Sequence, residues 1–124
     1  MMSGSYSDDR WEVVLLDDVV EWFTALPVRD AELVAAAIDL LEEHGPSLGR
    51  PLVDQVKTSR HHNMKELRPV STGRSEIRIL FAFDPHRRAV LLIAGDKAGN
   101  WKPWYAQIIP VADDRYDEWL RTEL

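Results

Sequence analysis

The sequence predicts an α+β fold: a small antiparallel sheet with an N-terminal helical hairpin and C-terminal helices. Apolar residues recur at helical spacing near both ends of the chain, whereas the middle alternates with the period of a strand. The chain has 124 residues, of which 45% are hydrophobic, and this suits one domain with one core. We therefore expect the element order β-α-α-β-β-β-α, with the helices covering one face of the sheet.

The chain begins with a short polar segment. Residues 1–9 are small and polar, and we expect them to form a flexible N-terminus ahead of a single domain over residues 10–124. Residues 11–16 are rich in β-branched and aromatic side chains and predict the opening strand.

Two helices follow this strand. Asp17 or Asp18 is the expected N-cap of the first helix, which Pro27 ends. Asp30 is the expected N-cap of the second, which ends at Gly45. Apolar residues form a stripe along the second helix opposite acidic residues, so the sequence predicts a hairpin with an acidic outer face.

The central segment predicts three strands. Residues 61–68 form the first, with a bulge expected because their pattern does not alternate cleanly. Residues 75–84 alternate, which places Arg78 on the face opposite the apolar side chains. A turn then leads into residues 89–94, an apolar run typical of a strand covered on both faces.

The last part of the chain predicts two helices. An amphipathic pattern begins at Trp101, and we expect Trp101 and Tyr105 to lie on its core side. Pro110 should divide this helix from a final one, which Asp113 or Asp114 caps.

Composition excludes several classes of protein. No apolar run approaches the ~18 residues that cross a bilayer, and the N-terminus lacks the pattern of a secretory signal. The chain has 0 Cys, which excludes disulfides, a thiolate nucleophile and a Cys-based zinc site. We expect a cytoplasmic protein without membrane contact.

The charge is unevenly distributed. The chain carries 15 basic and 21 acidic side chains, a net charge of -6. Between Lys57 and Lys102, however, the sequence contains ten Lys and Arg but four Asp and Glu, which gives this segment a net charge of +6. Because exposed charges beyond the ~8–10 Å Debye length are largely screened, this segment can present an anion-binding surface on an acidic protein.

Three linked motifs carry a resemblance to a known family. They are Met64-Lys65-Glu66-Leu67-Arg68, then Ser75-Glu76-Ile77-Arg78-Ile79-Leu80-Phe81, then Leu91-Leu92-Ile93-Ala94-Gly95-Asp96-Lys97. In this order, over roughly residues 10 to 110, the chain resembles the RelE/HigB superfamily of toxins and is most similar to its phage-derived HigB-like branch.

The resemblance implies a compact sheet-and-helix fold and a function. It implies a metal-free mRNA endoribonuclease (mRNA interferase) that acts on the translating ribosome, inhibits translation and needs no cofactor. It also implies neutralisation by a helix-turn-helix antitoxin, through which the toxin would reach DNA only indirectly. Two alternatives stay open: a gyrase-poisoning toxin on the same fold, and a catalytically inert family member that only binds its antitoxin.

The chemistry of RNA cleavage indicates which residues are candidates for catalysis and for RNA binding. Charge accumulates on the phosphate in the transition state, and the planar guanidinium of Arg serves it best. The expected catalytic residues are Arg78, Arg68, Lys65, Lys97 and Tyr105, where Tyr105 matches a Tyr or His that family members place near the end of the domain. The expected RNA-binding residues are Arg74, Lys102 and Trp104. We expect no metal site, because adjacent strand residues such as His61 and His62 point to opposite faces.

Overall fold

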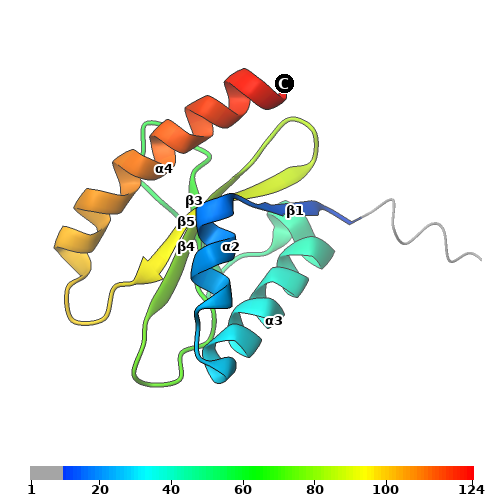
Figure 1. Cartoon of the computed structure of the whole chain (residues 1–124). Coiled ribbons are helices and arrows are strands. Elements are labelled where there is room, and N and C mark those ends of the chain that lie inside the picture. The colour runs from blue at the N-terminus through cyan, green and yellow to red at the C-terminus, as the bar shows by residue number, and fades with distance from the viewer. Residues whose placement is uncertain (1–9) are drawn as a thin grey trace, which may run out of the picture.

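The computed structural model describes residues 10–124, and its centre is one five-stranded sheet in the order β1-β5-β4-β3-β2 (Figure 1). The strands are β1 (Glu12–Leu15), β2 (Val53–Gln55), β3 (Lys65–Leu67), β4 (Ile77–Phe83) and β5 (Arg88–Asp96). β1 pairs with β5 in parallel, and the other neighbours are antiparallel. The α+β class is confirmed, whereas the flexible segment predicted for residues 1–9 lies outside the described residues.

The N-terminal helical hairpin covers one face of the sheet. It consists of α2 (Asp17–Thr24) and α3 (Val28–His44), which the short 3-10 helix η1 (Gly45–Ser47) follows. The predicted N-caps are wrong, because Leu16 and Pro27 occupy those positions and the carboxylates fall in the first turns. There they still face the positive ends of the helix dipoles.

Helices cover both faces of the sheet, and the prediction of one covered face is wrong. The odd-numbered residues Ile79 and Phe81 of β4 pack in the core beneath α2 and α3. The even-numbered residues Leu80 and Ala82 pack in a second core beneath α4 (Trp101–Glu123). In Figure 1 the strands lie between α4 on the left and α2 and α3 on the right. Both faces of β4 are apolar, so both need a cover.

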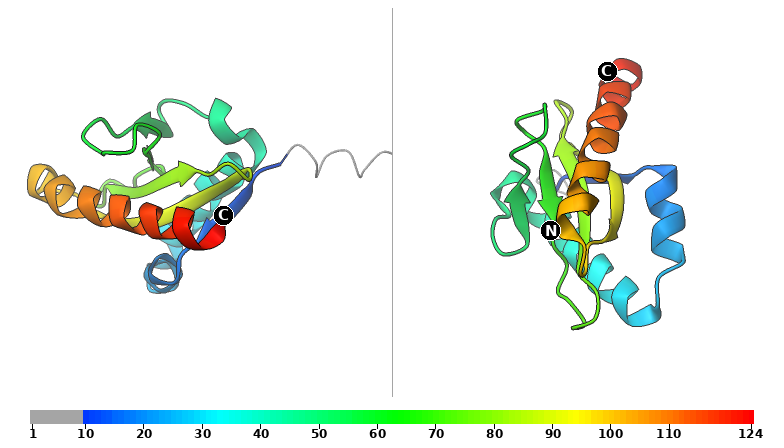
Figure 2. Two further views of the ribbon diagram at one scale, coloured as in Figure 1. Left: turned by 90° about the horizontal axis from the view of Figure 1, so that it is seen from above. Right: turned by 90° about the vertical axis from the view of Figure 1, so that its left-hand side faces the viewer.

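One C-terminal helix replaces the two that were predicted. α4 runs without a break past Pro110, as both views in Figure 2 show. Proline removes one hydrogen bond to the carbonyl four residues earlier, which here belongs to the exposed Ala106. The helix continues because Ile109, Ala112 and Tyr116 extend one buried stripe across the proline.

Asp113, predicted as a cap, lies buried in the middle of α4 and holds a loop. Its carboxylate accepts hydrogen bonds from the Ser59 hydroxyl and, at 3.1 Å, from the backbone N–H of Arg60. Arg60 also pairs with Asp114 and Asp117 on the same helix. The segment between β2 and β3 is therefore fixed against α4.

The strands around the site differ in two ways from the prediction. The strand predicted over residues 61–68 shortens to β3, because residues 61–63 form a turn, and β2 was not predicted. The bulge lies instead between β4 and β5, where Leu80 pairs with Ile93 but Phe81 pairs with Leu91. β3 itself keeps a regular register, so its side chains alternate strictly between the two faces.

Candidate functional site

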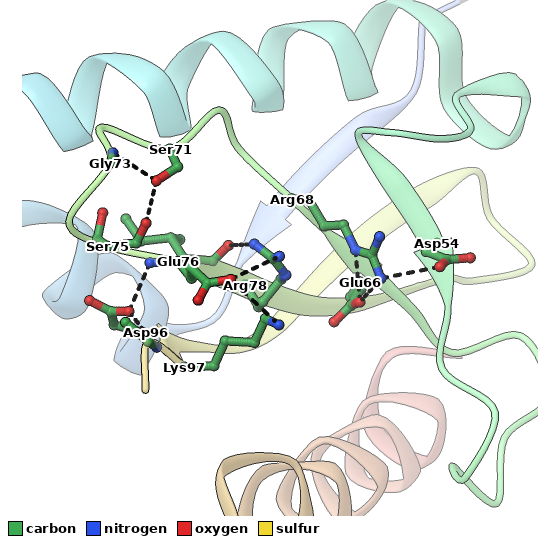
Figure 3. A network of polar contacts seen from close by, with 12 residues as sticks. Asp54, Glu66, Arg68, Ser71, Gly73, Ser75, Glu76, Arg78, Asp96 and Lys97 are labelled. Carbon is green, nitrogen blue, oxygen red and sulfur yellow. Dashed lines mark hydrogen bonds and ion pairs between the residues drawn. The ribbon is translucent and has the colours of Figure 1, made fainter. Parts of the chain in front are cut away.

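Arg78 and Lys97 form the centre of a basic cluster at the end of the α4 face. Both side chains lie near the Glu76 carboxylate, with the Arg78 guanidinium at 3.9 Å and the Lys97 ammonium at 3.7 Å from the same oxygen (Figure 3). The Arg78 and Lys97 side chains are only 15% and 16% exposed, whereas Glu76 is 49% exposed. The cations are therefore held in place by the fold, and the acid that faces them is free to move.

The Arg78 guanidinium has spare hydrogen-bonding capacity. One terminal nitrogen donates to the backbone carbonyl of Ile77 at 2.8 Å, and the buried Nε has no hydrogen-bond partner within residues 10–124. A buried donor without a partner is costly, so this atom needs an explanation in terms of strain, function or an unseen partner.

Arg68 is held beside this cluster by two acids. It donates from Nε and from a terminal nitrogen to one oxygen of Glu66, at 2.9 and 2.7 Å, and pairs with Asp54 at 3.1 Å (Figure 3). Glu66 is 4% exposed and precedes Arg68 by two residues, so both lie on the same face of the strand. The ion pairs outweigh the effect of burial and raise the pKa of Arg68, so it stays charged.

Tyr105 completes the cluster from α4. Its hydroxyl donates to the second oxygen of Glu66 at 2.6 Å, and the Lys97 ammonium lies 5.7 Å from the centre of its ring. Burial and, next, the hydrogen bond to Glu66 raise the pKa of Tyr105 to about 12, and the nearby Arg78 guanidinium opposes this rise. Tyr105 is therefore protonated at neutral pH and can donate a hydrogen bond or a proton, but it is not a base.

Three of these side chains line two surface hollows. Arg68 and Arg78 line one hollow of about 340 Å³, together with Glu76. Arg68 also lines a second hollow of about 320 Å³, together with Glu66 and Tyr105. Arg68 therefore borders both hollows.

Four of the five predicted catalytic residues meet here, and Lys65 does not. Arg78, Arg68, Lys97 and Tyr105 all belong to the cluster just described. Lys65 pairs with Phe81 across a regular register, so it lies on the α2 and α3 face of the sheet. The bulge that would bring Lys65 and Arg68 to one face does not occur in β3.

The structure does not bring the three predicted RNA-binding residues together, because two are exposed on different elements and Trp104 packs inward. Arg74 is exposed in the loop between β3 and β4, and Lys102 is exposed at the start of α4. Trp104 packs on Gly95, where an added Cβ would lie 2.9 Å from its Nε1 atom. Trp101, expected on the core side, is 54% exposed, and that expectation is wrong. The helix turns Trp104 inward because Gly95 leaves room for a large ring.

Sequence reasoning missed the acids of the site. Glu66 connects Arg68 to Tyr105, and Glu76 faces Arg78 and Lys97. The spacing Glu-x-Arg on a strand was a usable signal for both pairs, because it places two opposite charges on one face.

Within residues 10–124, no group of three or more His, Asp or Glu side chains is arranged to hold a metal ion. His61 lies in a turn and not in a strand, and a hydrogen bond of 2.7 Å joins its Nε2 atom to the Asp117 carboxylate. Over the same range, no helix combines the length and the apolar character needed to cross a membrane.

The chain is similar to known proteins in sequence and in fold. Residues 21–117 match the family described as phage-derived protein Gp49-like. Two proteins of Mycobacterium tuberculosis, named as candidate toxins, are similar in sequence. HigB3 is 59% identical over 90% of this chain and 95% of its own length, and HigB2 is 56% identical over 85% of this chain and 52% of its own length.

A solved structure shares the fold. It is a double arginine-to-alanine mutant of the E. coli toxin RelE in the free state, with a TM-score of 0.56 and 9% sequence identity. The match covers 93% of this chain and 99% of the RelE chain. Both structures are small sheets with helices packed on them, and at this identity the similarity concerns the fold alone.

Proposed function

This chain belongs to the phage-derived Gp49-like family, has HigB-type relatives and adopts the RelE fold, and from that premise we propose that it is the toxin of a toxin–antitoxin system that cleaves messenger RNA on the ribosome. The observation that carries this proposal is the convergence of three cations and one protonated phenol on one solvent-accessible site. Cations stabilise the charge that builds up on the phosphate during phosphodiester cleavage, and a proton donor can protonate the leaving oxygen.

The proposed reaction uses the RNA's own 2'-hydroxyl as nucleophile. The 2'-oxygen attacks the adjacent phosphorus as the bond from phosphorus to the 5'-oxygen breaks, leaving a 2',3'-cyclic phosphate and a 5'-hydroxyl. The proton of the 2'-hydroxyl leaves to water. Tyr105 donates a proton to the leaving 5'-oxygen and regains one from solvent.

The cations stabilise the phosphate as its charge grows. Arg78 offers its guanidinium, and Lys97, which directly follows β5, adds a second positive charge. A substrate phosphate would replace the Glu76 carboxylate, which faces both cations. Arg68 is already bonded to Glu66 and Asp54, so it contributes charge and holds Glu66 in position for Tyr105.

The partners and the location of the protein belong to the same proposal. A small helix-turn-helix antitoxin would neutralise the toxin and carry the complex to DNA, and the site of action would be the cytoplasm. A partner that covers the basic segment of net charge +6 would bind rapidly, because opposite charges steer the encounter.

The test is inducible expression in a bacterial host followed by 5'-end mapping of cellular RNA. We expect new in-frame cuts within translated messages, which co-expression of the antitoxin suppresses. Arg78→Ala should reduce cleavage about 100-fold or more, the loss typical of removing one charged contact to a developing oxyanion.

Arg29→Ala is the matched control. Arg29 lies on α3, its side chain is 71% exposed, and it pairs only with the surface residue Glu32 in its helix. Cleavage by this variant should equal wild type. If cleavage persists in Arg78→Ala, the proposed site is wrong. Growth arrest with intact messages and damaged DNA would select gyrase poisoning instead, and no arrest would select the inert family member.

A further inference from the structure

An exposed aromatic ring lies beside the proposed cleavage site and does not pack in the core. Trp101 begins α4 and is 54% exposed, the largest exposed aromatic side chain among residues 10–124. Tryptophan is enriched at interfaces, because its ring offers a large apolar surface and its N–H offers a polar contact. Trp104, one turn further along the helix, provides the packing on the sheet instead.

Trp101 lines two hollows that share a wall. One has a volume of about 320 Å³ and also contains Arg68 and Tyr105 of the proposed cleavage site. The other has a volume of about 420 Å³ and continues along α4 past Lys102 to Pro110. A strand that passes Arg68 and Tyr105 would therefore meet the Trp101 ring next.

The charge of this surface fits an anion. Lys57 and Arg68 line the first hollow, and Lys102 lines the second, with its ammonium 5.5 Å from the centre of the Trp101 ring. The single carboxylate among the described lining residues is Glu66, which Arg68 and Tyr105 already engage.

The far wall of the hollows is rigid. Thr58 lines both of them and immediately precedes Ser59 and Arg60, which bond to the buried carboxylate of Asp113. A preformed apolar hollow with cations at its rim matches an unpaired nucleobase joined to a phosphate.

We propose that Trp101 is the stacking platform for a nucleobase of the bound single-stranded RNA next to the cleaved phosphate, with Lys102 and Lys57 holding the flanking phosphates. The inference rests on the proposed RNA cleavage and adds a residue that determines how the strand is seated. Stacking tolerates every base, so the platform contributes affinity and position more than sequence readout.

The test measures binding without cleavage. The probe is a fluorescein-labelled single-stranded RNA of mixed sequence with 2'-O-methyl ribose throughout, which has no nucleophile, and the readout is fluorescence anisotropy with the full chain. Trp101→Ala should weaken binding about 5- to 150-fold, the effect of losing one base–aromatic stack. Trp101→Phe should restore most of the affinity, because it keeps an aromatic face.

Two controls separate stacking from a general disturbance. Val28→Ala truncates another exposed apolar side chain, 77% exposed on α3, and should leave binding unchanged. Single abasic positions placed along the RNA should reveal one position that weakens binding to wild type but not to Trp101→Ala. Thermal unfolding of each variant should match wild type.

The outcomes distinguish this inference from the proposed function. Wild-type affinity in Trp101→Ala, or equal further losses for every abasic RNA, overturns the platform while Arg78-dependent cleavage can stand. Normal RNA binding with lost antitoxin binding would make Trp101 a protein contact and overturn it too. If the wild-type chain binds no RNA and cuts no message, both proposals fail.

Discussion

Glu66 is the residue on which the order of the candidate site depends. Its carboxylate accepts from Tyr105 at 2.6 Å and from Arg68 at 2.9 and 2.7 Å while it is 4% exposed. A buried charge is tolerated when it is paired and fully hydrogen-bonded, and removing one partner leaves the others unsatisfied. One side chain thus fixes both a strand residue and a helix residue of the site.

Glu66→Gln should lower the pKa of Tyr105 from about 12 without returning it to the ordinary value of 10.0, because burial, the larger cause of the rise, remains. Cleavage should also fall, since a neutral amide holds Arg68 less firmly. The pKa is measured by NMR of the Tyr Cζ carbon. Asp39→Asn, on the exposed face of α3, is the control and should change neither quantity.

The raised pKa of Tyr105 also affects the stability of the fold at high pH. The pKa of Tyr105 is higher in the folded chain than its ordinary value of 10.0, so folding favours the protonated phenol. That stabilisation is complete below pH 10.0 and is lost as the pH rises through about 12. Glu66→Gln should reduce this loss, and an unchanged profile would contradict the role given to Glu66.

At the scale of elements, the contact between β5 and α4 positions the site. Gly95 lies on β5 beneath Trp104, and Trp104 meets Tyr105 edge to face with ring centres 5.0 Å apart. Arg78 pairs with Gly95 across the two strands. The absence of a side chain at Gly95 therefore lets α4 approach closely enough for Tyr105 to reach Glu66.

Gly95→Ala should destabilise the fold and reduce cleavage together. The new Cβ would lie 2.9 Å from the Trp104 ring, so the ring must move and the start of α4 with it. Overpacking of this kind costs about 1–3 kcal/mol, measured by urea unfolding. Gly49→Ala is the matched control, because an added Cβ there meets no atom within 4 Å. Equal stabilities of the two variants would contradict the tight contact.

At the scale of the whole molecule, charge is unevenly distributed. The net charge is -6, yet the segment from Lys57 to Lys102 carries +6 and contributes Arg68, Arg78, Lys97 and Lys102. The acidic helical hairpin packs on the other face of the sheet. An RNA strand on the site would therefore be separated from this hairpin by the sheet.

This separation predicts a strong effect of salt on RNA binding. Three phosphates are neutralised if Arg78 and Lys97 share the cleaved phosphate and Lys102 and Lys57 each bind one flanking phosphate. The slope of log affinity against log salt should then be about -2, since each neutralised phosphate of a single strand contributes about -0.7. The measurement is the anisotropy titration across a series of KCl concentrations. Lys102→Ala should reduce the slope by about one contact, whereas Arg29→Ala should leave it unchanged. A flat dependence would contradict phosphate binding.

The sequence by itself determined the fold class and most of the elements, and four of its five catalytic candidates lie together in the structure. Periodicity reports which side chains share a face, so Arg78 was correctly separated from Ile77 and Ile79. The family followed from short motifs on adjacent strands, and the matched family covers residues 21–117.

Only the tertiary structure decided which elements pack against each face of the sheet and of α4. The register of β3 places Lys65 on the face of the sheet opposite the site. The buried apolar residues beyond Pro110 allow α4 to continue as one helix. The burial of Trp104 and the exposure of Trp101 depended on Gly95, which lies on another element. The local pattern of apolar residues determines whether a segment has the period of a helix or of a strand. Which of its faces becomes buried depends on the elements that pack against it, and these are distant in sequence.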